Sequence, residues 1–310
     1  MRKCFLWLFT FLAGCGLLLP GTPTLADPSI RLFDDAGHAV VLDAPARRIV
    51  SLAPYLTELL YAAGAGDAIV GTSEFSDYPQ AARDIPRIGG GAGLDIEAII
   101  ALQPDLVVAW QSGNPEGQLE RLQALGTTLF LSEPRQLLDV PGTLVRLGKL
   151  AGSEQAAQAA VRSFEVRHRK LQQRYSGRPT VDVFYQVWRQ PLMTVNGEHL
   201  ISDVIRLCGG RNVFSDLPVL APQIDIEAVL AADPAVIIVG TGGTSETAEL
   251  QEWTRWPMLA AVARGHVYGV QRELLVRHSP RILDGAEQVC GILEKVRGEK
   301  SEKSEVKREE

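Results

Sequence analysis

Short apolar runs alternate with helical segments along most of the chain. The apolar runs have the length and composition of buried strands and lie at 48–52, 68–71, 106–110 and 127–131. A helical segment at 57–63 follows the first of them and ends at Gly64. Ahead of the first run, 30–33 and 39–42 flank an Asp/Gly turn and predict a hairpin. Strands that alternate with helices form parallel sheets covered by helices, so the pattern predicts an α/β fold.

One sequence pattern occurs twice, at 94–108 and again 130 residues later at 224–238. In each copy an aspartate, Asp95 or Asp225, precedes a short apolar helix. A proline then ends that helix just before a buried strand. Two copies so far apart predict two similar lobes rather than a solenoid of short repeats.

The segment 153–175 contains no glycine or proline, and its apolar residues recur with a helical period. Gly177 and Pro179 follow it and end the helix. Such a helix is about 35 Å long, enough to run from one lobe to the other. We therefore expect two Rossmann-like lobes with parallel central sheets, joined by one long backbone helix that limits their closure. The expected units are the lobes 27–150 and 179–297 and the connecting segment 151–178.

The N-terminal 26 residues have the features of a secretory signal peptide. Arg2 and Lys3 precede an apolar run, and the small-x-small tripeptide 24–26 provides a cleavage site. The tetrapeptide that ends at Cys15 also resembles a lipoprotein cleavage box, although the apolar run continues past it. We expect a cleaved signal peptide at 1–26 and an exported chain, with lipid anchoring at Cys15 as the alternative.

The composition, with 46% apolar and 22% charged residues, is typical of a globular protein. The net charge of −6 argues against a nucleic-acid partner, because binding phosphates requires a basic face. Residues 298–310 are nearly all Lys, Glu, Ser and Arg, which predicts a disordered tail. We expect the mature protein to be a monomer.

Two of the four cysteines, Cys4 and Cys15, lie in the signal segment. Cys208 and Cys290 remain in the exported chain, where an oxidising compartment favours one disulfide. Two buried free thiols are the alternative.

No catalytic or metal-binding motif is visible. The glycine-rich segments 89–93 and 240–244 lack the lysine and hydroxyl residue of a phosphate-binding loop. The sequence has neither a Gly-x-Ser-x-Gly elbow nor a His-Glu-x-x-His motif. The five histidines are scattered along the chain without the spacing of metal ligands. They are His38, His168, His199, His266 and His278. We therefore expect neither an enzyme nor a resident cofactor; an exported α/β hydrolase is the remote alternative.

Two other features are candidates for function. Glu97 and Glu227 occupy equivalent positions in the two repeats. Each alone is an ordinary helix-start carboxylate, but a matched pair on two lobes suits docking to arginines of one partner. Aromatic residues also lie near Gly and Pro turns or strand ends, where α/β folds bind ligands, although the same residues suit capping of the core; examples are Phe75, Tyr78, Trp110, Tyr185 and Trp188.

These motifs together resemble the periplasmic cobalamin-binding proteins, which are helical-backbone (class III) solute receptors of ABC importers. The resemblance covers nearly all of the mature chain and is carried by 48–54, 57–59, 76–79, 104–110, 113–114, 208–214, 222–223 and 279–282. It implies a periplasmic receptor that captures cobalamin or a related corrinoid and delivers it to membrane permease subunits. Cobalamin is then the transported ligand and not a cofactor.

The resemblance also implies roles for individual residues. Glu97 and Glu227 match the family's glutamates that dock onto permease arginines, and Cys208 with Cys290 matches its disulfide. The expected ligand contacts are Phe75, Tyr78, Trp110, Trp188, Glu273, Leu274, Leu275, Val276 and Arg277.

The sequence departs from the family pattern in its expected cleft. Gly91 and Ala221 stand where the best-known member has tryptophan, and Trp188 stands where that protein has a small residue. These changes leave a haem or iron–siderophore receptor on the same fold as the alternative. Haem requires an axial ligand such as Tyr55, Tyr78 or His278, and a siderophore requires basic residues such as Arg272, Arg277 and Arg281.

Overall fold

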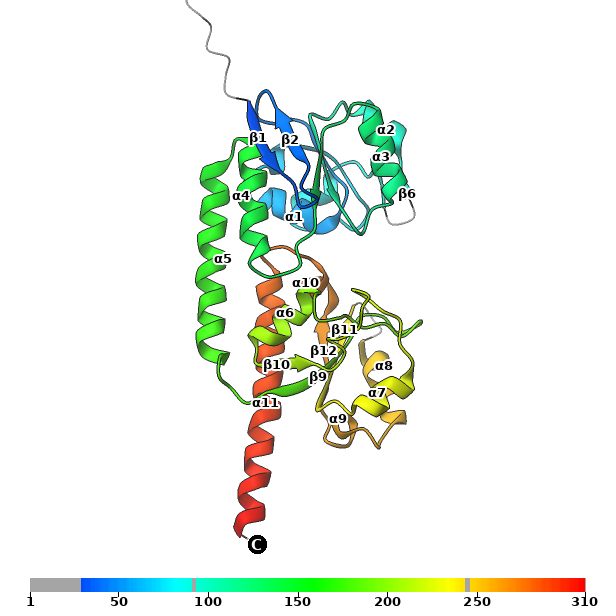
Figure 1. Cartoon of the computed structure of the whole chain (residues 1–310), viewed down its shortest axis with the longest axis vertical. Helices are drawn as coiled ribbons and strands as arrows, with labels where there is room; N and C mark the ends of the chain where they lie inside the picture. Colours follow the sequence, from blue (N-terminus) through cyan, green and yellow to red (C-terminus); the bar gives the residue numbers. More distant parts are fainter. Residues whose placement is uncertain (1–28, 91–92, 243–245, 310) are drawn as a thin grey trace, which may run out of the picture.

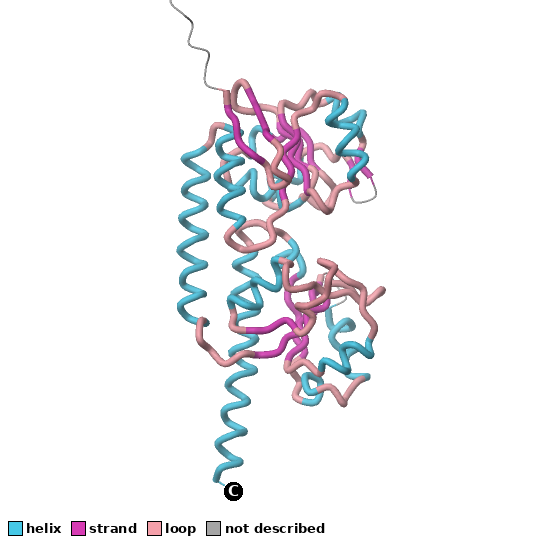
Figure 2. Tube along the Cα trace, in the orientation of Figure 1, coloured by secondary structure: helices cyan, strands magenta, loops and turns pink. Residues whose placement is uncertain are grey.

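The computed structural model describes residues 29–90, 93–242 and 246–309. The predicted signal peptide and Gly91 lie outside these residues. Two α/β lobes are stacked along the long axis of the molecule, and one long helix runs beside both (Figure 1, Figure 2). The predicted fold class is therefore confirmed.

The N-terminal lobe is built on a four-stranded parallel sheet with the order β4-β3-β7-β8. Its strands are β3 (Ile49–Ser51), β4 (Ile69–Thr72), β7 (Leu106–Trp110) and β8 (Leu129–Ser132). Its helices are α1 (Pro54–Ala62), α2 (Ile96–Ala101), α3 (Glu116–Ala124) and α4 (Asp139–Ala151). Two antiparallel pairs complete the lobe, the predicted hairpin β1 (Ile30–Phe33) with β2 (Ala39–Leu42), and β5 (Gly89–Gly90) with β6 (Gly93–Leu94).

The C-terminal lobe repeats this arrangement with the parallel order β10-β9-β11-β12. Its strands are β9 (Val181–Gln186), β10 (Gly210–Asn212), β11 (Val236–Thr241) and β12 (Val267–Gln271). Its helices are α6 (Leu200–Leu207), α7 (Ile226–Ala232), α8 (Glu246–Gln251), α9 (Ala260–Ala263), α10 (Arg272–Val276) and α11 (Ile282–Glu309). In both sheets the lobe's second strand is at the edge, followed by its first, third and fourth. The lobes therefore share one topology, as the repeat predicted.

The sequence repeat corresponds to α2–β7 in one lobe and α7–β11 in the other. Each helix is followed by a residue with left-handed backbone, Gln103 (φ 46°) or Asp233 (φ 37°), directly before a proline. That turn ends the helix and sends the chain into the third strand of the sheet. The two copies are thus equivalent in structure as well as in sequence.

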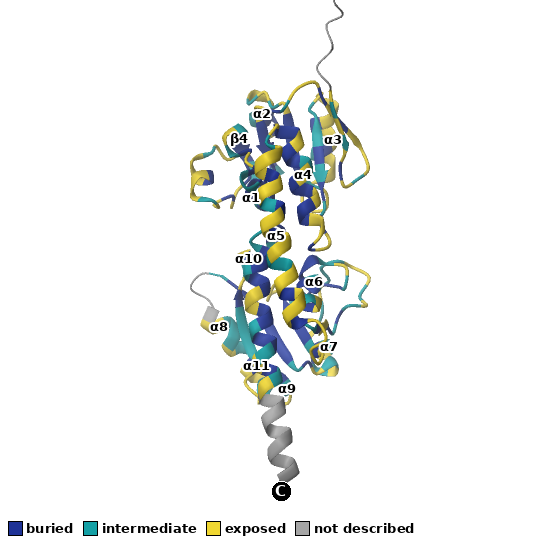
Figure 3. Cartoon of the chain, turned by 90° about the vertical axis from the view of Figure 1, so that its left-hand side faces the viewer, coloured by how far each residue is buried: buried dark blue, intermediate teal, exposed yellow. Residues whose placement is uncertain are grey.

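The backbone helix α5 (Glu154–Tyr175) confirms the prediction for 153–175. Its buried side chains pack against α4 and α11. They are Ala157, Val161, Phe164, Leu171 and Tyr175. A Cβ at Gly148 of α4 would lie 2.4 Å from the Cβ of Ala157, so the close approach of α4 and α5 requires glycine. The opposite side of α5 is exposed along its length (Figure 3).

A disulfide joins Cys208, at the end of α6, to Cys290 of α11. This confirms the pairing and excludes the two free thiols. Both cysteines are fully buried in an apolar cluster that also includes residues of α4 and α5. The bond therefore ties α11 to the core of the C-terminal lobe.

Two sequence-based expectations differ from the structure. Helix α1 begins at Pro54, three residues before the predicted start, because proline's fixed φ and missing N–H suit the first turn of a helix. The tail expected to be disordered is helical instead, since α11 continues to Glu309. Residues 299–309 contain no glycine or proline, and Lys and Glu favour helix, which is consistent with α11 continuing past Gly298.

Candidate ligand-binding site

The carboxyl end of the N-terminal sheet faces the C-terminal lobe. Trp110 is the last residue of β7, and its ring centroid lies 6.0 Å from that of His278, which follows α10. Tyr55 of α1 lies 5.4 Å from the same imidazole. Because open α/β sheets bind ligands at the carboxyl ends of their strands, this junction between the lobes is where we locate the candidate site.

Three large aromatic side chains around this junction are exposed. Phe75 and Tyr78 follow β4 in the N-terminal lobe, and Trp188 follows β9 in the C-terminal lobe. Their exposed fractions are 74%, 46% and 49%. Phe75 also has a left-handed backbone (φ 62°), which is rare for a bulky residue and common at functional sites. Both lobes thus present exposed aromatic side chains beyond the carboxyl ends of parallel strands, where α/β folds bind ligands.

Each of two aromatic rings lies under an arginine. The guanidinium of Arg281 is 3.9 Å from the ring centroid of Tyr78, and that of Arg272 is 5.0 Å from the ring of Trp188. Arg272 also donates two hydrogen bonds to the carbonyl oxygen of Gly240. The arginines hold one side of these rings, and about half of each aromatic side chain remains exposed.

A buried carboxylate connects the two lobes. Glu58 of α1 accepts a hydrogen bond of 2.5 Å from the Ser279 hydroxyl and one of 3.0 Å from Arg281 Nη1. Only 3% of the Glu58 side chain is exposed, and burial raises the pKa of its carboxyl although both partners act to lower it. A second inter-lobe ion pair, Arg277 with Asp77, spans 3.7 Å.

The histidines at this junction are buried and neutral at physiological pH. Burial lowers the pKa of His278 to about 3 and that of His199 to about 4. The Nδ1 of His278 and the Nε1 of Trp110 have no hydrogen-bond partner among the described residues. The described part of the chain contains no group of His, Cys, Asp and Glu that could hold a metal ion.

The expected contacts at 273–277 are only partly available to a ligand. Leu274 and Leu275 of α10 are 6% and 0% exposed, so their side chains offer little surface to a ligand in this structure. They face inward because the short helix α10 needs an apolar face to pack against α11. Glu273 is exposed, Val276 is half-buried and Arg277 is held by Asp77.

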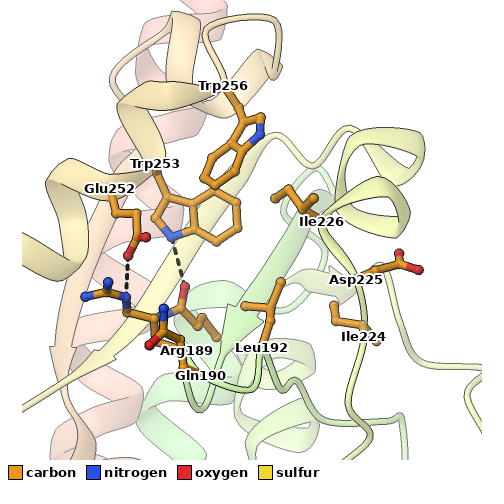
Figure 4. Close-up of a pocket in the computed structure, with 10 residues that line it drawn as sticks. Arg189, Gln190, Leu192, Ile224, Asp225, Ile226, Glu252, Trp253 and Trp256 are labelled. Carbon is orange, nitrogen blue, oxygen red and sulfur yellow. Dashed lines mark hydrogen bonds and ion pairs between the residues drawn. The ribbon is translucent and has the colours of Figure 1, made fainter.

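One pocket in the C-terminal lobe was not anticipated from the sequence. It has a volume of about 240 Å³ and starts at Gln186, the last residue of β9. Figure 4 shows the indoles of Trp253 and Trp256 on one side and Leu192, Ile224 and Ile226 on the other. The Trp253 Nε1 donates to the Gln186 side-chain oxygen at 2.9 Å. Nothing in the local sequence pattern around these tryptophans indicates that they meet the end of β9.

The two repeat glutamates lie in the first turns of α2 and α7 and are exposed. Figure 1 shows both helices on the side of the molecule away from α5. Glu97 forms an exposed ion pair of 3.3 Å with Arg121, which contributes little to stability. A partner that approaches this side would meet one glutamate on each lobe.

The comparisons with known proteins agree with this architecture. Residues 49–274 match the family described as periplasmic binding protein. The chain is 38% identical over 252 residues to a vitamin B12-binding protein of Vibrio cholerae serotype O1, covering 80% of this chain and 90% of the relative. It is 36% identical over 262 residues to the vitamin B12-binding protein of Photorhabdus laumondii, covering 84% and 93%.

Solved structures show the same similarity. The periplasmic vitamin B12-binding protein of Vibrio cholerae superposes with a TM-score of 0.77 at 37% identity, covering 82% of this chain and 98% of that one. The haem-binding protein RhuT of Roseiflexus sp. RS-1 superposes with a TM-score of 0.70 at 21% identity, covering 81% and 99%, and at that identity it shares the fold alone. The chain therefore belongs to the periplasmic binding protein family.

Proposed function

We propose that this protein captures vitamin B12 or a related corrinoid between its two lobes and delivers it to the permease subunits of an ABC importer. In this role it is a monomeric, non-catalytic receptor in the periplasm, exported by the signal segment 1–26. The assignment of the ligand is supported by relatives that are named vitamin B12-binding proteins and match most of the chain.

The observation that carries the proposal is the set of exposed aromatic side chains presented by both lobes, Phe75, Tyr78 and Trp188. A corrinoid is a large ligand with extensive apolar surface, and burial of such surface contributes about 25 cal/mol per Å². Covering roughly 100 Å² of each aromatic side chain would then contribute about 2–3 kcal/mol per residue. In the C-terminal lobe, Ala221 stands where the best-known family member has tryptophan. Trp188 supplies an indole in the same lobe.

The siderophore alternative is disfavoured by the pairing of its expected arginines. Arg272 donates to Gly240 and lies 3.7 Å from Glu249, Arg277 pairs with Asp77, and Arg281 pairs with Glu58. Recruiting them for an anionic ligand would break existing hydrogen bonds and leave the buried Glu58 carboxylate unpaired.

The haem alternative has one accessible candidate among its three expected axial ligands. Tyr55 and His278 are 2% and 5% exposed, and the Tyr55 hydroxyl already donates to the Ser132 carbonyl. Tyr78 is exposed and remains available. Haem therefore belongs in the binding experiment as the main competitor.

The proposal is tested by titrating the mature protein with cyanocobalamin, haem and a ferric hydroxamate, followed by calorimetry and visible absorbance. We expect submicromolar binding of cyanocobalamin and weaker or no binding of the others. Tight binding of haem without binding of cobalamin would refute the proposal. Delivery is tested separately, by cobalamin uptake into membrane vesicles that contain the cognate permease.

A further inference from the structure

Arg281 makes two contacts in the N-terminal lobe, although it belongs to the C-terminal lobe. Its Nη1 donates to the buried Glu58 carboxylate at 3.0 Å, and its guanidinium carbon lies 3.9 Å from the ring centroid of Tyr78. Glu58 and Tyr78 come from different segments, α1 and the loop after β4. One planar side chain therefore links a buried inter-lobe ion pair to an exposed aromatic residue of the candidate site.

We propose that Arg281 is a positioning residue that holds the Tyr78 ring at the lobe junction and thereby sets the affinity for the ligand. The inference rests on the proposed function, because Tyr78 is assigned there as a ligand contact. Arg281 would act on the ligand through Tyr78 and would not contact the ligand itself.

The geometry of the guanidinium suits this role. The Ser279 hydroxyl donates to the Glu58 carboxylate and holds it in place. That carboxylate in turn accepts a hydrogen bond from Arg281 and restrains its guanidinium. A planar cation can stack on a ring and donate hydrogen bonds in its own plane at the same time. A lysine ammonium has no such plane, so it would keep the charge but lose the stacked arrangement.

The neighbouring ion pair supports the same conclusion. Arg277 of the C-terminal lobe lies 3.7 Å from Asp77, the residue directly before Tyr78. The Arg277 side chain is 10% exposed and that of Asp77 is 58% exposed, so this contact guides the position of the loop more than it adds to stability. Two arginines of one lobe thus hold the same loop of the other lobe, and Tyr78 projects from that loop.

The test is a double-mutant cycle between Arg281 and Tyr78, with cyanocobalamin affinity as the readout. We expect Arg281→Met to weaken binding about ten-fold in the wild-type background and by less than about two-fold in Tyr78→Ala, because coupled residues are not additive. Arg281→Lys should recover only part of the affinity. Arg264→Met, an exposed arginine in the same lobe, is the matched control and should bind normally.

A stability control separates positioning from folding. Arg281→Met leaves Glu58 buried and unpaired and should lower the melting temperature, whereas Glu58→Gln/Arg281→Met removes the unpaired charge and should restore it. Affinity should stay low in that double variant because the Tyr78 ring is still not held. Recovery of affinity together with stability would overturn the inference.

Two failures can be told apart. Equal losses from Arg281→Met in the wild-type and Tyr78→Ala backgrounds would show that Arg281 does not act through Tyr78, and the inference would be wrong while the proposed function stands. Absence of cyanocobalamin binding by the wild-type protein would refute the proposed function and the inference with it.

Discussion

Asp95 and Asp225 cap equivalent helices in the two lobes by the same hydrogen bond. The Asp95 carboxylate accepts from the backbone N–H of Ala98 at 2.9 Å, and the Asp225 carboxylate accepts from that of Ala228 at 2.8 Å. Each aspartate satisfies a donor that the first turn of a helix otherwise leaves unpaired.

Replacing either aspartate with alanine should lower the free energy of unfolding by about 1 kcal/mol, the usual cost of losing an N-cap. The two sites lie in different lobes, so the losses should add in the double variant. Urea denaturation measures both effects. Glu120→Ala, an exposed position in α3, is the matched control, and an equal loss there would show that capping is not the cause.

Removal of the disulfide should destabilise the protein. The cysteines are 82 residues apart in sequence, and loss of a bond that closes a long loop typically costs about 2–5 kcal/mol. We expect Cys208→Ser/Cys290→Ser to melt at lower temperature than the oxidised wild type. Reductant should lower the wild-type melting temperature and leave that of the variant unchanged; a wild type that is insensitive to reductant would contradict the prediction.

Truncation of the exposed aromatic residues should weaken ligand binding without loss of stability. Phe75→Ala and Trp188→Ala should each reduce the affinity for cyanocobalamin at least about ten-fold, because each removes apolar surface that the ligand would cover. Phe33→Ala is the control, since Phe33 is 62% exposed on the hairpin β1–β2. Unchanged affinity in both site variants would place the ligand elsewhere.

Charge reversal of the repeat glutamates should separate binding from delivery. Glu97→Lys/Glu227→Lys should abolish uptake into permease-containing vesicles, because both carboxylates would then repel the partner's arginines. Its affinity for the ligand should match the wild type in the titration. Glu165→Lys reverses an exposed charge on α5, on the side of the molecule away from α2 and α7, and should transport normally; a fall in ligand affinity for the double variant would place these glutamates in the ligand site.

Acid should destabilise the protein through His278. Its pKa is lowered to about 3 in the folded protein, mainly by burial and further by His199, so the unfolded chain binds the proton first as the pH falls. Stability from this residue is present above about pH 6.5 and is lost between pH 6.5 and 3, by at most about 1.4 kcal/mol per pH unit. His278→Phe should therefore show a shallower loss in this range.

The comparison for His278 requires paired curves. Burial raises the pKa of Glu58, so this carboxylate contributes in the opposite sense and favours the folded state more as the pH falls. Subtracting the variant's stability from that of the wild type at each pH isolates the histidine. His38→Gln, at an exposed position on the hairpin turn, is the control; parallel curves for His278→Phe and wild type would contradict the prediction.

Periodicity was enough to predict the architecture because this fold repeats itself. The two copies of the repeat, which contain Pro104 and Pro234, predicted two lobes. The uninterrupted helical pattern at 153–175 predicted the helix that connects them. These features depend on local helix and strand signals. The strand order within each sheet depends on which strands pair, and no local pattern in the sequence specifies that.

The candidate site was only partly predictable for the same reason. Phe75 and Trp188 were candidates because aromatic residues near turns and strand ends lie where α/β folds bind ligands, and the structure does expose them. Leu275 belongs to a stretch that the resemblance assigns as a whole, and a resemblance of that kind does not distinguish the inward face of α10. The role of Glu58 was missed although a carboxylate between Thr57 and Leu59 in an apolar helix requires a partner, and that partner lies more than 200 residues away.

Helix α11 has a practical consequence for measuring these interactions. It continues to Glu309, beyond the C-terminal lobe (Figure 1, Figure 2), and its last twelve residues would extend about 18 Å. A dye or an affinity tag attached at the C-terminus would therefore be carried on a helical spacer, well away from the junction between the lobes. The protein can then be immobilised for single-molecule recording with both lobes accessible to ligand and transporter.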